Sequence, residues 1–172
     1  AASTWMSSCR APGCRSAAVD SLDVAVLGAT EIDTSFNINV HTDSNGSIMG
    51  GSGGHSDAAA GSKLALIAAP LFRGRLPIVR DRVTCISTPG QDVDVLVTQA
   101  GVAVNPKNTE LRERLRAAGL PVVDIHELKE RAERITGVPA PLPVSDRVVA
   151  RVISRDGELL DTIRQTDNRS GI

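Results

Sequence analysis

Aromatic residues are nearly absent from this sequence of 172 residues. Its three aromatic residues, Trp5, Phe36 and Phe72, leave the core to Val, Leu, Ile and Ala, although hydrophobic residues make up an ordinary 41%. Small aliphatic side chains suit closely packed layers of strands and helices. A chain of this length fits one domain and buries roughly 70% of its unfolded surface.

An excess of charge and long apolar runs are also lacking. The formal net charge is -1, which removes any general electrostatic attraction to nucleic acid or to an anionic membrane. The longest apolar stretch, 64–72, falls well short of the roughly 18 residues that a transmembrane helix needs. We therefore expect a soluble protein with no nucleic-acid or membrane partner.

Cysteine is too sparse for a disulfide framework. Cys9, Cys14 and Cys85 form neither regular pairs nor a zinc-binding pattern. An odd, low count is typical of a reducing compartment, so we expect a cytoplasmic protein.

Residues 1–18 differ in composition from the rest of the chain. They are rich in Ser, Ala and Cys, with two arginines and no acidic residue. This composition weakly resembles an organelle transit peptide. No amphipathic helical stripe is visible, however, and we favour a disordered or truncated terminus. Residues 19–172 then form one domain.

Strand and helix patterns alternate within 19–172. The apolar run 22–28 predicts a strand that is buried on both faces. Helices are clearest where Leu111, Leu115 and Ala118 share a face, ended by Gly119, and along the apolar stripe from Ile125 to Ile135, where Asp124 and Glu127 resemble a capping box. Further strands are predicted at 37–40, 63–71, 83–87, 93–97 and 102–104, a short helix at 55–62, and a hairpin at 147–154 and 159–164. The fold class is therefore α/β, a layered mixed sheet with flanking helices.

The glycine cluster Gly50-Gly51-Ser52-Gly53-Gly54 is the most unusual feature. A backbone with four glycines in five residues can approach a ligand closely and adopt positive φ. The short helix expected directly afterwards, capped by Ser56 or Asp57, would aim free N–H groups at the same point. Such a device suits phosphate, carboxylate or a developing oxyanion. The alternative is a surface loop without chemistry.

Three sharper motifs can be tested against this cluster. A P-loop needs Gly-Lys-Ser/Thr, which 61–63 does not provide, and a dinucleotide fingerprint needs glycine where Ser56 stands. Gly-x-Ser-x-Gly at 50–54 does match a nucleophile elbow, so a serine hydrolase using Ser52 remains an alternative. Its candidate bases are His41, His55 and His126.

Other polar residues give weaker signals. A His-x-Asp pattern occurs at 41–43 and again at 55–57, but such pairs arise easily by chance and we expect no metal site. Glu31 follows a predicted strand and could serve as nucleophile or base, or be a solvated turn residue. The arginines within 73–82 could meet an anion or line an exposed connection.

Several motifs recur with one family's spacing. They are DVAVLGATEID at 23–33, FNINV at 36–40, IMGGSGGHSD at 48–57, RGR at 73–75, DRV at 81–83, TPG at 88–90, VAVNP at 102–106 and AGLP at 118–121. Together they resemble the citrate lyase alpha chain, from about residue 19 to about 165. These motifs do not extend into 1–18, and the first half of the longer family chain is absent.

The resemblance implies a fold and a reaction. The family belongs to the wider coenzyme A transferase group, built from two related α/β halves with the active site between them, and this chain would be the C-terminal half. Acetyl-carrier and citrate would give citryl-carrier and acetate. Implied partners are the beta chain, which cleaves citryl-carrier, and the acyl carrier protein (gamma) chain. No cofactor would be tightly bound, since the carrier brings its own dephospho-coenzyme A-type prosthetic group.

The resemblance also nominates residues for the site. Its wall would be formed by Gly50, Gly51, Ser52, Gly53, Gly54, His55 and Asp57. Asn37 and Asn39 would position a carboxylate. In related transferases a glutamate carries the acyl group, but it lies upstream of this chain, so Glu31 stays a weak catalytic candidate. Half a site could leave the chain inactive alone, and a non-catalytic module that binds coenzyme A-like ligands or subunits is the alternative.

Overall fold

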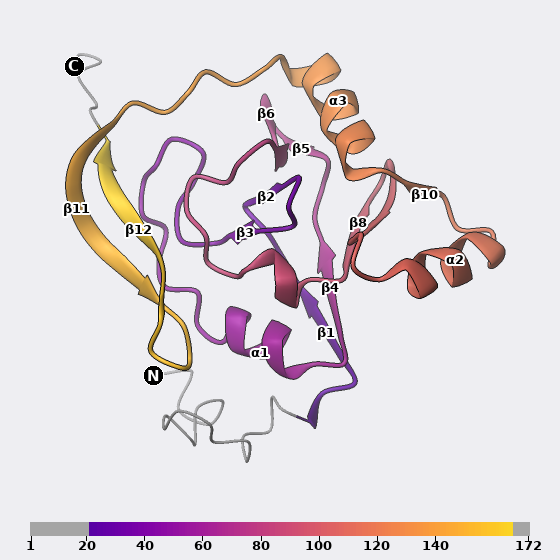
Figure 1. Ribbon diagram of the computed structural model, residues 1–172. Coiled ribbons are helices and arrows are strands. Elements are labelled where there is room, and N and C mark those ends of the chain that lie inside the picture. The colour runs from indigo at the N-terminus through magenta and orange to yellow at the C-terminus, as the bar shows by residue number, and fades with distance from the viewer. Residues whose placement is uncertain (1–20, 167–172) are drawn as a thin grey trace.

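The computed structural model describes residues 21–166, which fold as a mixed α/β structure (Figure 1). The helices are α1 (His55–Gly61), α2 (Thr109–Ala117) and α3 (Ile125–Thr136), with a 3₁₀ turn η2 (Gly90–Asp92). The strands are β1 (Val24–Leu27), β2 (Glu31–Asp33), β3 (Ile38–Asn39), β4 (Leu64–Ala68), β5 (Phe72–Arg73), β6 (Leu76–Pro77), β7 (Val79–Arg80), β8 (Val95–Thr98), β9 (Gly101–Val104), β10 (Val122–Val123), β11 (Val144–Ile153) and β12 (Leu159–Thr166).

The main sheet has five strands in the order β1-β4-β8-β9-β10. Strands β1, β4 and β8 are parallel, β9 returns antiparallel to β8 around Gly101, and β10 runs parallel to β9. The predicted hairpin at Gly101 and the mixed sheet are thereby confirmed. The chain crosses from β1 to β4 through α1, so the loop that follows β1 and the start of α1 lie at the same edge of the sheet.

One face of this sheet carries the core. Leu27, Ile67, Leu96 and Ala103 point into a cluster that also includes Leu128 of α3. The predicted shortage of aromatic packing holds, because Phe36 is the only aromatic residue in the buried part of the cluster. Aliphatic side chains supply the rest, as the composition requires.

The prediction that the first strand is buried on both faces is wrong. The side chains of Val24 and Val26 are 49% and 66% exposed, whereas Ala25 between them is buried. Strand β1 lies at the edge of the sheet, and no described helix packs on the face that bears the two valines. The apolar run therefore predicts burial of both faces of the strand, but only the face that bears Ala25 is buried among the described residues.

A small sheet, β3-β2-β7, packs beside the main one and was not expected from the sequence. Its central strand β2 is fully buried although two of its three residues, Glu31 and Asp33, are acidic. The Asp33 carboxylate accepts the N–H groups of Ser35 and Asn37, each at 2.9 Å. Asp33 therefore closes a turn inside the protein, and Glu31, for which a solvated turn was one expectation, is buried beside it.

The strand predicted at 83–87 does not form. Val83, Cys85 and Ser87 are buried in alternation, which produces the strand-like pattern. Within this segment, however, Thr84 N–H donates to Glu31 at 2.9 Å and Ile86 N–H donates to Asp161 at 2.8 Å, and only at its end does Ser87 N–H donate to the backbone of β3, at Ile38 O. Carboxylates thus replace a neighbouring strand as acceptors for Thr84 and Ile86.

The helix predictions are mostly confirmed. Asp124 caps α3 by accepting the N–H of His126 at 2.8 Å. The expected cap of α1 is wrong, because Gly54 occupies the N-cap position and no side chain bonds there. His126, named above as a candidate base, is exposed in the first turn of α3.

The predicted C-terminal hairpin is present as β11 and β12, a two-stranded sheet of its own (Figure 1). Its buried apolar contact with the rest of the described chain is a small cluster of Cys85, Val152 and Ile163. Gly46 touches the same region closely: a Cβ there would lie 2.4 Å from Thr166 and 2.7 Å from Leu142. Gly46 also has φ +81°, so the backbone favours glycine here, and a Cβ would displace the ends of the two neighbouring side chains.

Candidate functional site

The glycine loop Gly50–Gly54 lies on the surface, between β3 and α1. Gly50 has φ +156° and Gly53 has φ +59°, conformations that side-chain-bearing residues rarely adopt. A Cβ added to Gly50, Gly51 or Gly53 would meet no atom within 4 Å. Gly50 and Gly53 are therefore required for backbone shape, and all three glycines leave open space where a ligand could approach.

The N–H groups of this loop are free within the described part of the chain. Met49 N–H donates to His41 O at 2.8 Å before the loop, and His55 N–H donates to Ser52 O at 3.1 Å after it. No protein acceptor among residues 21–166 takes the N–H groups of Gly50 to Gly54. Consecutive unpaired N–H groups in such a turn form a concave site for an anion. Helix α1, with seven residues, adds only a short dipole.

His55 fixes the end of the loop to the sheet. Its Nε2 lies 2.8 Å from Gly28 O, so this nitrogen donates, and Nδ1 lies 2.8 Å from Thr88 Oγ1. With Nε2 protonated, the neutral ring accepts the Thr88 hydroxyl at Nδ1. Burial lowers the pKa of His55, which favours this neutral form. Both ring nitrogens are therefore occupied, and His55 positions the loop.

His41 is a candidate that the sequence analysis considered only as a ligand or hydrolase base. Its Nδ1 forms a short hydrogen bond with Ser87 Oγ, and Ser87 Oγ accepts the N–H of Val40 at 3.0 Å. Its Nε2 has no partner among the described residues. Burial lowers the pKa of His41. The fold thus places a neutral imidazole with one free nitrogen where the chain enters the loop.

Asn37 and Asn39 are occupied within the fold. Asn37 donates to Asp33 at 3.1 Å and accepts the N–H of Gly90 at 2.9 Å. Asn39 is fully buried; it donates to Glu31 at 3.0 Å and to Thr42, and it accepts the N–H groups of His41 and Thr42. These bonds do not fit the expected role of holding a substrate carboxylate.

Glu31 is equally inaccessible. Its side chain has no exposed surface and accepts from Asn39 and from Thr84 N–H, while Arg80 Nη1 lies 2.9 Å from its second oxygen. A carboxylate enclosed in this way cannot attack a thioester without local unfolding. This position fits neither a catalytic group nor a solvated turn residue, the two expectations for Glu31. Its carboxylate is instead an internal counter-ion of Arg80.

His55 cannot serve Ser52 as a hydrolase base, and no described histidine side chain is hydrogen-bonded to Ser52. The candidate base nearest to Ser52 in sequence, His55, has no free ring nitrogen. Asp57 lines a cavity of about 350 Å³ whose wall also contains Asp92 and Glu158. Burial raises the pKa of Asp92. An acidic cavity of this kind does not suit an anionic substrate.

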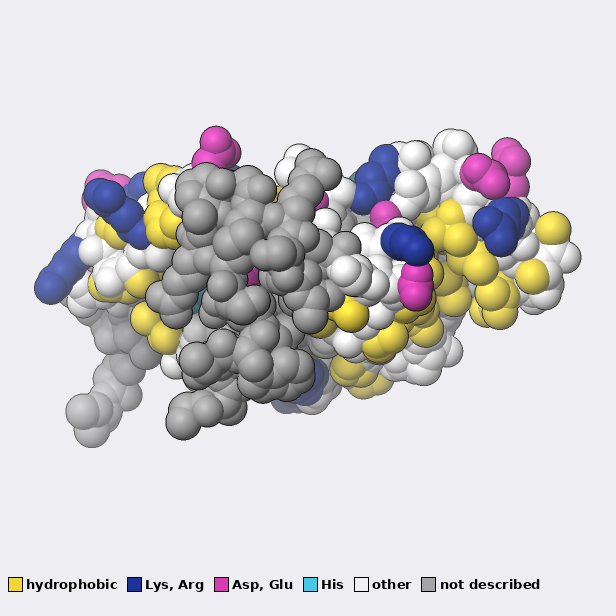
Figure 2. Space-filling model, turned by 90° about the horizontal axis from the view of Figure 1, so that it is seen from below, with side chains coloured by type: hydrophobic (Ala, Val, Ile, Leu, Met, Phe, Trp, Pro, Cys, Tyr) yellow, Lys and Arg dark blue, Asp and Glu magenta, His cyan; other side chains and the backbone are white. Residues whose placement is uncertain are grey.

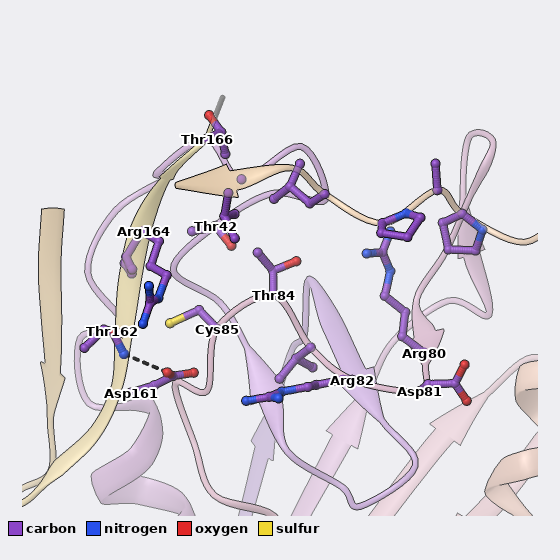
Figure 3. A pocket seen from close by; sticks show the side chains of 18 of the residues that line it. Thr42, Arg80, Asp81, Arg82, Thr84, Cys85, Asp161, Thr162, Arg164 and Thr166 are labelled. Carbon is purple, nitrogen blue, oxygen red and sulfur yellow. Dashed lines mark hydrogen bonds between the residues drawn. The ribbon is translucent and has the colours of Figure 1, made fainter. Parts of the chain in front are cut away.

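A larger cavity of about 630 Å³ lies between the hairpin and the core (Figure 3). Arg80, Arg82 and Arg164 line it together with Asp81, Asp161 and Glu133, so the charges balance. None of the glycine-loop residues belongs to its wall. Among residues 21–166 no three potential ligand side chains gather for a metal ion, and no helix there could cross a membrane.

Comparison with known proteins gives the same family as the sequence motifs. The model of the family described as "Citrate lyase, alpha subunit (CitF)" matches residues 5–166. This chain belongs to that family. The match begins inside 1–18, the segment without recognised motifs, whose expected disorder lies outside the described residues.

Two curated relatives and one crystal structure resemble the chain. It is 53% identical to the citrate lyase alpha chain of Klebsiella pneumoniae over 157 residues, covering 91% of this chain and 31% of the relative. The Escherichia coli K12 alpha chain is 54% identical over 153 residues, with coverages of 89% and 30%. An alpha subunit of citrate lyase from Streptococcus mutans, crystallised in complex with citrate, is 44% identical with a TM-score of 0.87, and the match covers 90% of this chain and 30% of that one. This family member thus spans about three tenths of these relatives.

Proposed function

We propose that this chain forms one wall of the transfer site of a citrate lyase alpha subunit. The reaction converts acetyl-carrier and citrate into citryl-carrier and acetate. The partners are the beta chain and the acyl carrier protein (gamma) chain, whose dephospho-coenzyme A-type prosthetic group bears the thioester. Family membership supports this assignment, as does the citrate held by the Streptococcus mutans relative.

The observation that carries the proposal is the glycine loop. When a carboxylate attacks a thioester carbonyl, the carbonyl oxygen becomes negatively charged until the sulfur leaves. Free backbone N–H groups stabilise such an oxygen, and loss of one donor typically costs about 10²- to 10³-fold in rate. The loop supplies these donors, with His55 anchoring one end to Gly28 and Thr88.

The site is incomplete within residues 21–166. Glu31 is enclosed and His55 is occupied, so His41 is the side chain near the loop with a free nitrogen. The group that attacks the thioester therefore comes from outside residues 21–166, or from the substrate itself.

The test is citrate-dependent acetate release from acetyl-coenzyme A, used as a stand-in for the carrier. This chain is mixed with the part of the Klebsiella pneumoniae relative that does not match it. We expect release from the mixture, and at least a 10-fold loss of kcat with Gly53→Ala, because the new side chain shifts the N–H donors. Absence of release from two folded pieces would contradict the proposal. Coenzyme A binding without exchange would instead support a binding module.

Gly119→Ala is the matched control. Gly119 also has a positive φ, +77°, and a Cβ there also meets no atom within 4 Å, but it ends α2, away from the loop. Each alanine costs about 1 kcal/mol of stability through backbone strain. Only Gly53→Ala reduces acetate release if the loop acts on the substrate. Equal activity in the two variants would refute a role for the loop.

A further inference from the structure

The face of the main sheet opposite the core is apolar and partly bare. In β1 and β4, Val24 is paired with Leu64 and Val26 with Leu66, and all four side chains point away from the core. Val24 is 49% exposed, Val26 is 66% exposed, and the two leucines are only partly buried. Parallel strands normally have both faces covered.

The two crossover helices explain why this face is bare. Helix α1 connects β1 to β4 and contacts both, and α2 connects β9 to β10 and contacts both. Both connections cross the sheet in the same direction. The parallel pair β1 and β4, however, points opposite to the parallel pair β9 and β10. Right-handed crossovers then place the two helices on opposite faces. Helix α2 therefore covers the β9–β10 end of the outer face and leaves β1 and β4 open.

Helix α2 itself has an unfilled side. None of its residues is buried, and its apolar residues Leu111 and Leu115 are only partly covered. Figure 2 shows hydrophobic side chains gathered in a continuous area on one side of the molecule, with an adjoining pair of oppositely charged residues. The ion pair Lys63–Asp23, both side chains about 80% exposed, lies at the amino ends of the same two strands. An apolar face with a polar border is typical of a protein contact surface.

We infer that this open face binds an amphipathic helix from the part of the citrate lyase alpha chain that lies outside this sequence. The two open strands lie about 5 Å apart, so one helix, about 10 Å across with its side chains, covers both. The Klebsiella pneumoniae and Escherichia coli relatives are covered over only 31% and 30% of their lengths, so the family chain has ample residues to supply it. The inference rests on family membership and on the sheet, and does not depend on the proposed reaction.

The experiment measures binding without turnover. The probe is the part of the Escherichia coli relative that does not match this chain, produced separately. Calorimetry and light scattering then follow its association with the wild-type chain and with Val26→Asp. We expect a one-to-one complex with the wild-type chain and binding at least ~30-fold weaker for Val26→Asp, because burial of an unpaired carboxylate is unfavourable. Val24→Asp provides a second variant on the same face.

Val149→Asp is the control, since Val149 is a similarly exposed valine, at 48%, in β11. It should bind within about threefold of wild type. Unchanged binding by both Val26→Asp and Val24→Asp, or no binding by the wild-type chain, would overturn the inference. So would self-association that Val26→Asp abolishes, which indicates a second copy as occupant. Binding seen only after removal of residues 1–20 would assign the face to the chain's own N-terminal segment.

These outcomes separate the inference from the proposed function. Gly53→Ala should lower acetate release at least 10-fold while leaving binding of the probe unchanged, because the loop and the open face are different surfaces. Val26→Asp should reduce acetate release and binding of the probe in proportion. Acetate release should recover when the concentration of the probe is raised to saturation.

Discussion

Replacement of Glu31 by glutamine tests whether this residue is structural. The carboxylate has no exposed surface and accepts hydrogen bonds from Asn39 at 3.0 Å and from Thr84 N–H at 2.9 Å. Its other oxygen lies 2.9 Å from Arg80 Nη1, an ion pair that lacks hydrogen-bond geometry. All its neighbours are therefore donors, and a glutamine NH₂ group has no acceptor to face.

The magnitude follows from the better of the two amide orientations. If the amide oxygen keeps the bonds to Asn39 and Thr84, the NH₂ group faces the guanidinium of Arg80, whose side chain is only 12% exposed. Removal of one partner from a buried ion pair costs roughly 3–5 kcal/mol, and we expect about 3 kcal/mol because the amide keeps two bonds. For a chain of this size that lowers Tm by about 6–12 °C.

Urea unfolding followed by far-ultraviolet circular dichroism at pH 7 measures this loss. The double variant Glu31→Gln/Arg80→Met should recover at least about 1 kcal/mol, since it removes the unpaired cation. A Glu31→Gln variant within about 0.5 kcal/mol of wild type would refute the reasoning. If that variant also lost acetate release in the reconstituted mixture, Glu31 would return as a catalytic candidate.

Three further predictions concern packing and titration. Gly90→Ala should destabilise the chain by more than about 2 kcal/mol in the same urea assay, because its Cβ would lie 2.0 Å from Ser35 O; a loss under 1 kcal/mol would contradict this contact. Because burial lowers the pKa of His55 below 6.5, its neutral form stabilises the fold above about pH 6.5, and this contribution is lost as pH falls through the lowered value. Tm should therefore drop from pH 7.5 to 5.5, and drop less in His55→Gln; equal drops would exclude the role. Burial raises the pKa of Cys85 to about 12, so Ellman's reagent should titrate fewer thiols in folded wild type than in urea, and this deficit should be one thiol smaller in Cys85→Ala.

Much of the fold could be predicted because local signals agree with the final structure. The Asp124 cap, the Gly101 hairpin and the β11–β12 hairpin each depend on a few adjacent residues. Strand β2 could not be predicted, because two of its three residues are acidic and their partners lie in distant segments. Thr84 is 53 residues from Glu31 in sequence, and nothing local indicates that its N–H will bond there.

The candidate site was predictable in part for the same reason. The glycine loop is visible in sequence, and its positive φ angles at Gly50 and Gly53 follow from composition. The roles expected for Asn37 and Asn39 did not follow, because a motif shows which residues recur but not whether they face a ligand or the protein. His41 would be recognised only by knowing that Ser87 lies against its ring, 46 residues away.

The hairpin β11–β12 has a consequence for local stability. Its own cluster contains three buried residues, whereas fifteen form the core against the main sheet. A two-stranded ribbon held by so little apolar contact can open while the sheet stays folded. Amide hydrogens of β11 should therefore exchange with solvent at a lower free energy than those of β4 and β8. Ile86 N–H, which bonds to Asp161 of β12, should exchange with the hairpin although it belongs to the core segment. The chain would thus have two units of cooperativity, with the wall of the larger cavity as the boundary between them.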